Sequence, residues 1–211
     1  MFITFEGPEG SGKSTQIALL CQALRDQGLD VLQTREPGGT PIAEQIRDVI
    51  HNTGNTAMLP SAEALLYSAA RAQHVAEKVV PALAEGTIVI SDRYAQSTLA
   101  YQGYGHGLDL ENLGAITQFA TGGLQPDLII YLDLPIEDGL GRKLRDREQG
   151  KGEWNRMDQL EADFHRRVRQ GYLLMAGADP GRWLIIDASL DIDTIHATIL
   201  DSVERRLADR G

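Results

Sequence analysis

The residues best suited to chemistry stand near the start of the chain, where glycines alternate with a lysine and hydroxyl side chains. The segment Gly7-Pro8-Glu9-Gly10-Ser11-Gly12-Lys13-Ser14, followed by Thr15, matches the phosphate-binding pattern G-x-x-x-x-G-K-[ST] without a gap. Glycines let the backbone turn its N–H groups inward to form an anion nest. The spacing predicts that Lys13 reaches the β- and γ-phosphates of a nucleoside triphosphate and that the Ser14 hydroxyl binds magnesium.

A second basic group lies far along the chain, at about 142–156. Five lysines and arginines fall within ten positions there, although the whole chain carries a net charge of -10. No arginine stands at the variable positions of the phosphate-binding segment, so a guanidinium for phosphoryl transfer must come from elsewhere. We predict a lid that closes over the nucleotide and supplies Arg145 and Arg147. The alternative is a solvated helix end.

Further candidates stand where an acceptor would bind. Asp92 and Arg93 directly follow an apolar strand, and ligands of open α/β sheets bind at the carboxyl ends of strands. Asp92 could join the magnesium shell, and Arg93 could clamp an anionic acceptor; the alternative is a surface ion pair. Tyr67 and Arg71 are four positions apart on a predicted helix and could hold a nucleobase. Their alternative is a tyrosine at the core margin beside a surface arginine.

The elements that must position these residues alternate along the chain. Apolar runs predict strands at 2–6, 31–34, 87–91, 128–132 and 183–186. Periodic segments predict helices at 14–27, 41–50, 62–85 (with Ser61 as N-cap), 110–120, 136–147, 157–177 and 192–208, with a loop at 148–155. Continuous apolar strands separated by helices indicate an α/β fold. We expect a doubly wound five-stranded parallel sheet with helices on both faces, of the P-loop NTPase type, in a single domain 1–211 with a short lid insertion.

Composition narrows the classes of partner. The chain has 211 residues, of which 30 are acidic and 20 basic, and this balance argues against binding a nucleic acid polymer or an anionic membrane. No run approaches the about 20 apolar residues of a membrane span. The one cysteine, Cys21, excludes an intramolecular disulfide and fits the core, and the five histidines show no zinc-ligand spacing. A cytoplasmic location is the default expectation.

Taken together, these segments resemble the thymidylate kinase family of the nucleoside-monophosphate kinase group. The resemblance extends over nearly the whole chain, with matching order and spacing. It rests on the segments Phe5–Thr15, Thr34–Thr40, Tyr67–Arg71, Asp92–Tyr94, Ser97–Gly103, Pro126–Leu128 and Tyr131–Asp133.

The resemblance implies ATP-dependent phosphorylation of dTMP to dTDP, with ATP and magnesium as cofactors and a homodimeric assembly. It also implies a base-binding set. Tyr67 would stack on thymine at a position where the family usually has phenylalanine, and Arg71 would donate to thymine O4. Thr98 would meet the base N3–H. Because cytosine carries an amino donor in place of O4, an arginine there disfavours dCMP.

The sugar and phosphate of dTMP would meet a second implied set. Glu9 would accept from the 3′-hydroxyl, and Tyr101 would pack beside the sugar and disfavour a 2′-hydroxyl. Arg93 and Arg47 would hold the 5′-phosphate, and Tyr172 would also line the sugar site.

The family resemblance leaves two matters open. The segment Asn155-Arg156-Met157-Asp158 departs from the Asp-Arg-x-Glu that is usual at this place in the lid. The residues themselves also admit other classes: another nucleoside-monophosphate kinase, a P-loop ATP-dependent ligase, or a nucleotide-gated switch.

Overall fold

A computed structural model of the chain describes residues 1–135, 139 and 162–209. The predicted lid at 142–156, with Arg145 and Arg147, lies outside the described residues. So do the predicted loop 148–155 and all but one residue of the predicted helix 136–147. None of the described helices is long and apolar enough to cross a bilayer.

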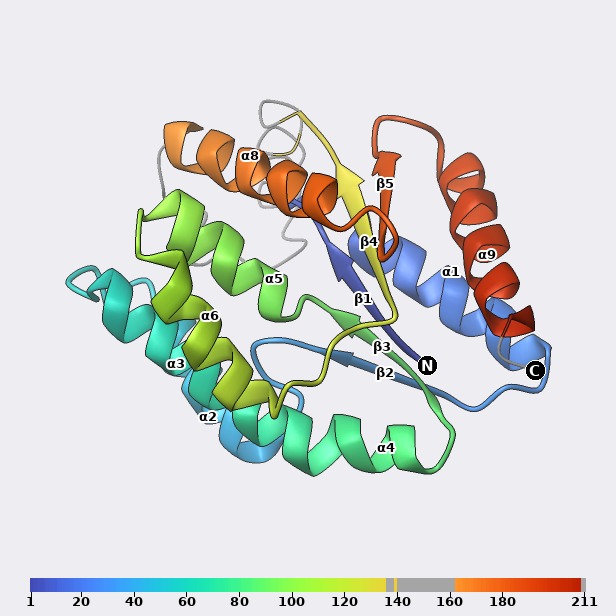
Figure 1. Ribbon diagram of the computed structural model, residues 1–211, viewed down its shortest axis with the longest axis horizontal. Coiled ribbons are helices and arrows are strands. Elements are labelled where there is room, and N and C mark those ends of the chain that lie inside the picture. Colours follow the sequence, from blue (N-terminus) through green and yellow to red (C-terminus); the bar gives the residue numbers. More distant parts are fainter. Residues whose placement is uncertain (136–138, 140–161, 210–211) are drawn as a thin grey trace.

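The fold is built on a five-stranded parallel sheet with the strand order β2-β3-β1-β4-β5. The strands are β1 (Phe2–Glu6), β2 (Val31–Arg35), β3 (Ile88–Asp92), β4 (Leu128–Asp133) and β5 (Trp183–Asp187). All five predicted strands are confirmed. Because β1 lies between β3 and β4, the loop that leaves β1 emerges in the middle of the sheet edge (Figure 1).

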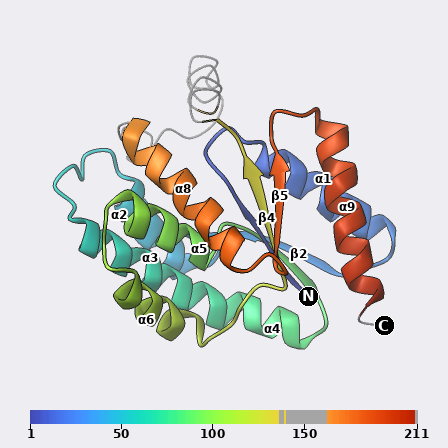
Figure 2. The ribbon, with the colours of Figure 1, turned by 45° about the horizontal axis from the view of Figure 1, so that its top comes forward.

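The described helices cover both faces of this sheet. On one face lie α1 (Lys13–Asp26) and α9 (Ile192–Ala208), which pack against each other (Figures 1 and 2). The other face carries α2 (Pro41–His51), α3 (Pro60–His74), α4 (Val80–Ala84), α5 (Ala95–Thr98), α6 (Leu110–Thr121) and α8 (Ala162–Ala178). The doubly wound α/β architecture is therefore confirmed.

The alternation of side chains along β1 divides the core between the two faces. Ile3 and Phe5 are fully buried in the cluster that joins α1, α9 and the sheet, and Cys21 is buried there as predicted. Phe2 points the other way, where its ring meets Tyr94 edge-on at 4.8 Å. A strand buried on both faces reads as a continuous apolar run, which is the pattern that the sequence shows.

The prediction of one helix over 62–85 differs from the observed structure in two respects. It begins at Pro60 after Leu59, which gives no side-chain cap, so the prediction of Ser61 as N-cap is wrong. Proline is preorganised for the first helical position and sets the helix start here. Between α3 and α4, residues Val75–Val79 form a π-helical segment in which the Val80 N–H bonds to the Val75 carbonyl. Pro81 follows and lacks an N–H for the ordinary ladder, which explains the wider turn.

A second helical region was not predicted. Residues Ala95–Thr98 form α5, and Leu99–Gly105 continue it as a π-helical segment. The segment contains two glycines and two tyrosines, so helix propensity gave no signal. It packs extensively on α8, and this tertiary contact stabilises the helical path.

Candidate active site

The phosphate-binding segment forms a tight loop between the end of β1 and the start of α1. Gly7, Gly10 and Gly12 have φ angles of 144°, 73° and 88°, values that side chains disfavour. A Cβ at Gly7 would lie 2.6 Å from the Leu132 carbonyl oxygen, so a side chain would collide with the β4 backbone. The loop ends at the N-terminus of α1. The free N–H groups and the dipole of this helix favour an anion there.

Lys13 folds back over this loop. Its Nζ donates to the Gly7 carbonyl at 3.1 Å and the Pro8 carbonyl at 2.9 Å, and the residue is only 7% exposed. Burial lowers the pKa of Lys13, with a smaller lowering from Arg93. In the same loop the Ser11 hydroxyl is buried and has no hydrogen-bond partner among the described residues. A lysine ammonium and a spare hydroxyl in one loop are groups that phosphate oxygens can engage.

Ser14 and Asp92 line one hollow of about 680 Å³ at the edge of the sheet, together with Thr34, Thr40 and Lys78. Ser14 stands in the first turn of α1 and Asp92 ends β3. A hydroxyl and a carboxylate are oxygen donors, which magnesium prefers. In the described part of the chain, no group of three or more His, Cys, Asp or Glu side chains could hold a metal ion by itself. Ser14 and Asp92 fit a magnesium ion that would take its other oxygens from nucleotide and water.

Arg93 faces the loop from the end of the neighbouring strand. Its φ angle is 72°, and it is the one described non-glycine residue with a positive φ. Its Nη2 donates to Glu9 Oε1 at 2.7 Å and to the Tyr101 hydroxyl at 3.1 Å, and the guanidinium lies 5.0 Å from the Tyr101 ring centre. The alternative of a surface Asp–Arg pair is wrong, because Arg93 pairs with Glu9 and its side chain is only 14% exposed.

Glu6 is fully buried and shares two hydroxyl partners, Ser97 and Tyr172, with Arg93. Its carboxylate accepts from the Tyr94 N–H at 2.9 Å, the Ser97 hydroxyl at 2.6 Å and the Tyr172 hydroxyl at 2.7 Å. Burial raises the pKa of Glu6, and nearby Arg93 opposes this rise. Ser97 and Tyr172 in turn lie 3.3 Å and 3.5 Å from Arg93 Nη1. Glu6 therefore fixes the two hydroxyl groups that flank the arginine.

Tyr67, on α3, shares an electrostatic environment with four other candidate residues. Burial raises the pKa of its hydroxyl group; Arg93 and Arg47 oppose this rise, and Tyr101 and Glu9 add to it. On α2, Arg47 also donates to the Pro37 carbonyl at 2.9 Å, which holds it beside the turn after β2.

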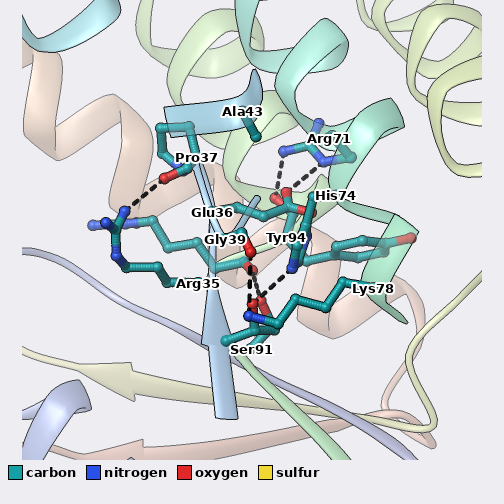
Figure 3. Close-up of polar contacts among 12 residues, drawn as sticks. Arg35, Glu36, Pro37, Gly39, Ala43, Arg71, His74, Lys78, Ser91 and Tyr94 are labelled. Atoms are coloured by element: carbon teal, nitrogen blue, oxygen red, sulfur yellow. Dashed lines mark hydrogen bonds and ion pairs between the residues drawn. The ribbon is translucent and has the colours of Figure 1, made fainter. Parts of the chain in front are cut away.

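Arg71 is 2% exposed, so the alternative of a surface arginine is wrong. Its Nε donates to Glu36 Oε2 at 2.7 Å (Figure 3). Its Nη1 donates to the Thr98 hydroxyl at 2.9 Å, and its Nη2 donates to the Tyr94 carbonyl at 3.0 Å. Arg71 and Thr98, the two predicted base-reading residues, are therefore in direct contact.

Sequence reasoning missed Glu6, Ser97 and Glu36 as parts of these networks. It also missed His74, whose Nδ1 lies 3.0 Å from Glu36 Oε1. Glu6 and Glu36 had one available signal, because each stands at the carboxyl end of a strand beside a candidate motif. Ser97 belongs to the segment Ser97–Gly103 that carries the resemblance, but neither Ser97 nor His74 has a spacing that marks a site, since a lone serine or histidine on a helix is common in folded cores.

A phosphate loop that faces an arginine held at the end of the next strand defines a P-loop phosphotransferase, here of the nucleoside-monophosphate kinase type. The model of the thymidylate kinase family matches residues 5–199. The chain belongs to the thymidylate kinase family.

Individual relatives match this chain over nearly their full length. The chain is 50% identical to a thymidylate kinase from Trichlorobacter lovleyi, covering 99% of each chain. It is 51% identical to one from Geotalea daltonii, over 98% of this chain and 97% of the relative. The crystal structure of thymidylate kinase from Ehrlichia chaffeensis superposes with a TM-score of 0.76 at 31% identity, covering 97% of this chain and 98% of that one.

Proposed function

We propose that this chain transfers the γ-phosphoryl group of ATP to the 5′-phosphate of dTMP, giving ADP and dTDP. The observation that carries the proposal is the contact between Arg93 and Glu9, 2.7 Å, which brings an acceptor-side arginine against the phosphate loop. Donor and acceptor phosphates bound on either side of this contact would meet at the edge of the sheet.

For ATP, we assign the loop Gly7–Thr15, whose backbone N–H groups would surround the phosphates. Lys13 would leave the loop carbonyls and take the β- and γ-phosphates, because a phosphate oxygen is a stronger partner for its ammonium. Ser14 and Asp92 would hold magnesium, which when bound neutralises charge on the ATP phosphates.

For the 5′-phosphate and sugar of dTMP, we assign Arg93, Arg47 and Glu9. The phosphate would replace the Glu9 carboxylate on Arg93, and the freed carboxylate would accept from the 3′-hydroxyl. The exposed fractions support this exchange, since the Glu9 side chain is 37% exposed and the Arg93 side chain 14%.

For the base, we assign Tyr67 as the stacking ring, Arg71 as the donor to thymine O4 and Thr98 as the partner of N3–H. Tyr101 would pack beside the deoxyribose. Tyr172, 1% exposed and bonded to Glu6, would contribute to the sugar site mainly by fixing its wall.

The chemistry needs no general base. An acceptor phosphate oxygen, already ionised near pH 7, attacks the γ-phosphorus in line, and the bond from that phosphorus to the β-phosphate oxygen breaks as ADP leaves. The residues act by positioning and by neutralising charge, with Lys13 and Arg93 on the two sides. We further propose that lid arginines Arg145 and Arg147 complete this charge neutralisation.

We also propose a cytoplasmic homodimer. On α6, Phe119 is 89% exposed, the largest exposed fraction among the described large apolar side chains, and contact between helices of two copies would cover it. Sedimentation velocity tests this assembly: Phe119→Asp should shift the protein towards monomer. An unshifted dimer would contradict the contact.

The decisive assay measures ADP release from magnesium-ATP with each common nucleoside monophosphate offered alone. Strong stimulation by dTMP, weaker by dUMP and little by dCMP or ribonucleotides is expected. Another preferred monophosphate would keep phosphoryl transfer and overturn the base assignments. In the same assay Arg71→Ala should weaken discrimination between dTMP and dCMP, and unchanged discrimination would refute the role of Arg71.

A further inference from the structure

The buried contacts of Arg71 extend beyond the base site through a histidine that the reaction does not use. His74, on α3, is fully buried and lies one helical turn from Arg71. Its Nδ1 lies 3.0 Å from Glu36 Oε1, while the second oxygen of Glu36 accepts from Arg71 Nε at 2.7 Å (Figure 3). One carboxylate thus joins the histidine to the arginine.

The direction of these hydrogen bonds follows from the chemistry of the groups. A carboxylate in contact with a guanidinium is an acceptor only, so Nδ1 carries the proton and donates to Glu36. The other ring nitrogen, Nε2, lies 2.7 Å from the Thr34 hydroxyl. Both ring nitrogens therefore have partners, and the plane of the ring is fixed between β2 and the turn that follows it.

The surroundings leave this ring little freedom. A Cβ at Gly39 would lie 2.8 Å from His74 Cδ2 and 2.9 Å from the Thr34 hydroxyl, so the Gly39 backbone packs directly on this contact. Lys78, one turn further along, donates to the Gly39 carbonyl at 3.2 Å and holds that backbone in place. The ring cannot turn without moving the turn after β2.

The orientation of Arg71 depends on the Glu36 carboxylate. The three contacts of Arg71 use one N–H on each of its nitrogens, and a guanidinium has five. Within the described part of the chain, one N–H on each terminal nitrogen remains for a substrate. Since the guanidinium is planar, the bond from Nε to Glu36 fixes the directions of both remaining donors together with the bonds to Thr98 and Tyr94.

We propose that His74 is a positioning residue that sets base selectivity, by locking the Glu36 carboxylate so that Arg71 presents its donors at one angle. This inference rests on the proposed function, because it assumes that Arg71 reads the base. Without the Nδ1 donor, the carboxylate can rotate and the guanidinium can follow it, which loosens the distinction between an acceptor and a donor on the base.

Two substitutions at His74 separate positioning from simple core packing. A glutamine amide can reach the place of Nε2 but not that of Nδ1, whereas an asparagine amide can take the place of Nδ1 and donate to Glu36. His74→Gln should raise the KM for dTMP about tenfold, change kcat little, and lower the preference for dTMP over dCMP about tenfold. His74→Asn should restore most of that preference.

The matched control is His165→Gln, the same change at a buried histidine on α8 outside this network. It should leave the preference for dTMP unchanged. If His74→Gln lowers the melting temperature but keeps the wild-type KM and preference, His74 is a packing residue and the inference is overturned. The inference is also overturned if His74→Asn loses as much of the preference for dTMP as His74→Gln does.

A measurement on the wild-type protein keeps the test valid where a variant fails to fold. The proton on His74 Nδ1, bonded to a carboxylate and shielded from water, gives its own NMR resonance. That resonance should shift when dTMP is added without ATP, and an unmoved resonance would contradict the coupling. A wild type without preference for dTMP overturns the proposed function too, whereas a wild type with preference isolates the failure to His74.

Discussion

Two arginine–glutamate pairs flank the proposed dTMP site, with the same N–O distance of 2.7 Å and different surroundings. In the pair Arg71–Glu36 the side chains are 2% and 3% exposed. In the pair Arg93–Glu9 they are 14% and 37% exposed. We call the first the closed pair and the second the open pair.

Burial decides what each pair can do. Breaking the closed pair would leave a charge in a dry interior, so its arginine stays in one place and can serve as a fixed reader of the base. The open pair borders water, so a phosphate can replace its carboxylate at little cost. The two pairs have the same contact distance, but the closed pair is rigid, whereas the open pair can exchange its carboxylate for a phosphate.

The largest effect should come from breaking the closed pair. Glu36→Gln leaves the Arg71 guanidinium buried without a counter-charge, which should lower the free energy of unfolding by about 3 kcal/mol. Urea denaturation measures this change. A loss below about 1 kcal/mol would show that the closed pair tolerates exchange after all.

The open pair should matter to turnover. Arg93→Ala should lower kcat on the order of a hundredfold, because it removes a charge contact made in the transition state. Steady-state ADP release measures it. The control is Arg205→Ala, whose side chain is 76% exposed and paired with Asp201 one turn away on α9. Near wild-type turnover in Arg93→Ala would refute the role of Arg93.

Glu6, which shares two hydroxyl partners with Arg93 of the open pair, should make stability depend on pH. Its pKa is raised above 4.5 by burial, so the folded state favours the protonated form. That contribution to stability is complete below pH 4.5 and is lost as pH rises through the raised pKa. Urea denaturation across this range should show wild type losing stability relative to Glu6→Gln as pH rises. Parallel profiles would contradict it, and the exposed Glu204→Gln is the control.

The smallest effect should come from the carboxylate of the open pair. Glu9→Gln should change the free energy of unfolding by less than about 1 kcal/mol, because the pair is partly solvated. This is the same change as in Glu36→Gln, so the two variants compare the pairs directly. Equal losses in both would remove the distinction between open and closed.

The sequence predicted best what is local. The phosphate loop is a contiguous pattern, and buried strands are continuous apolar runs, so the motif and all five strands could be placed without coordinates. Arg93 came from a strand end, Tyr67 and Arg71 from their helical spacing, and Thr98 from the resemblance. The structure brings Arg71 and Thr98 into contact.

What could not be predicted depends on contacts between distant segments. Glu6 and Tyr172 are 166 positions apart and share a 2.7 Å hydrogen bond that no spacing rule suggests. His74 stands alone on a helix, and its two partners are Thr34 in β2 and Glu36, the residue that follows β2. The π-helical segment Val75–Val79 is explained by Pro81, and the segment Leu99–Gly105 is stabilised by packing on α8. Helix propensities of single residues predict neither segment.

The backbone of Arg93 has a consequence for how this chain would respond to selection in the laboratory. An L-residue with a φ of 72° carries a conformational cost of about 1 kcal/mol that glycine avoids. Glycine at position 93 would remove this cost together with the contacts of the guanidinium with Glu9 and Tyr101. A library ranked by resistance to heat would weigh these two effects against each other, whereas a library ranked by turnover would retain arginine.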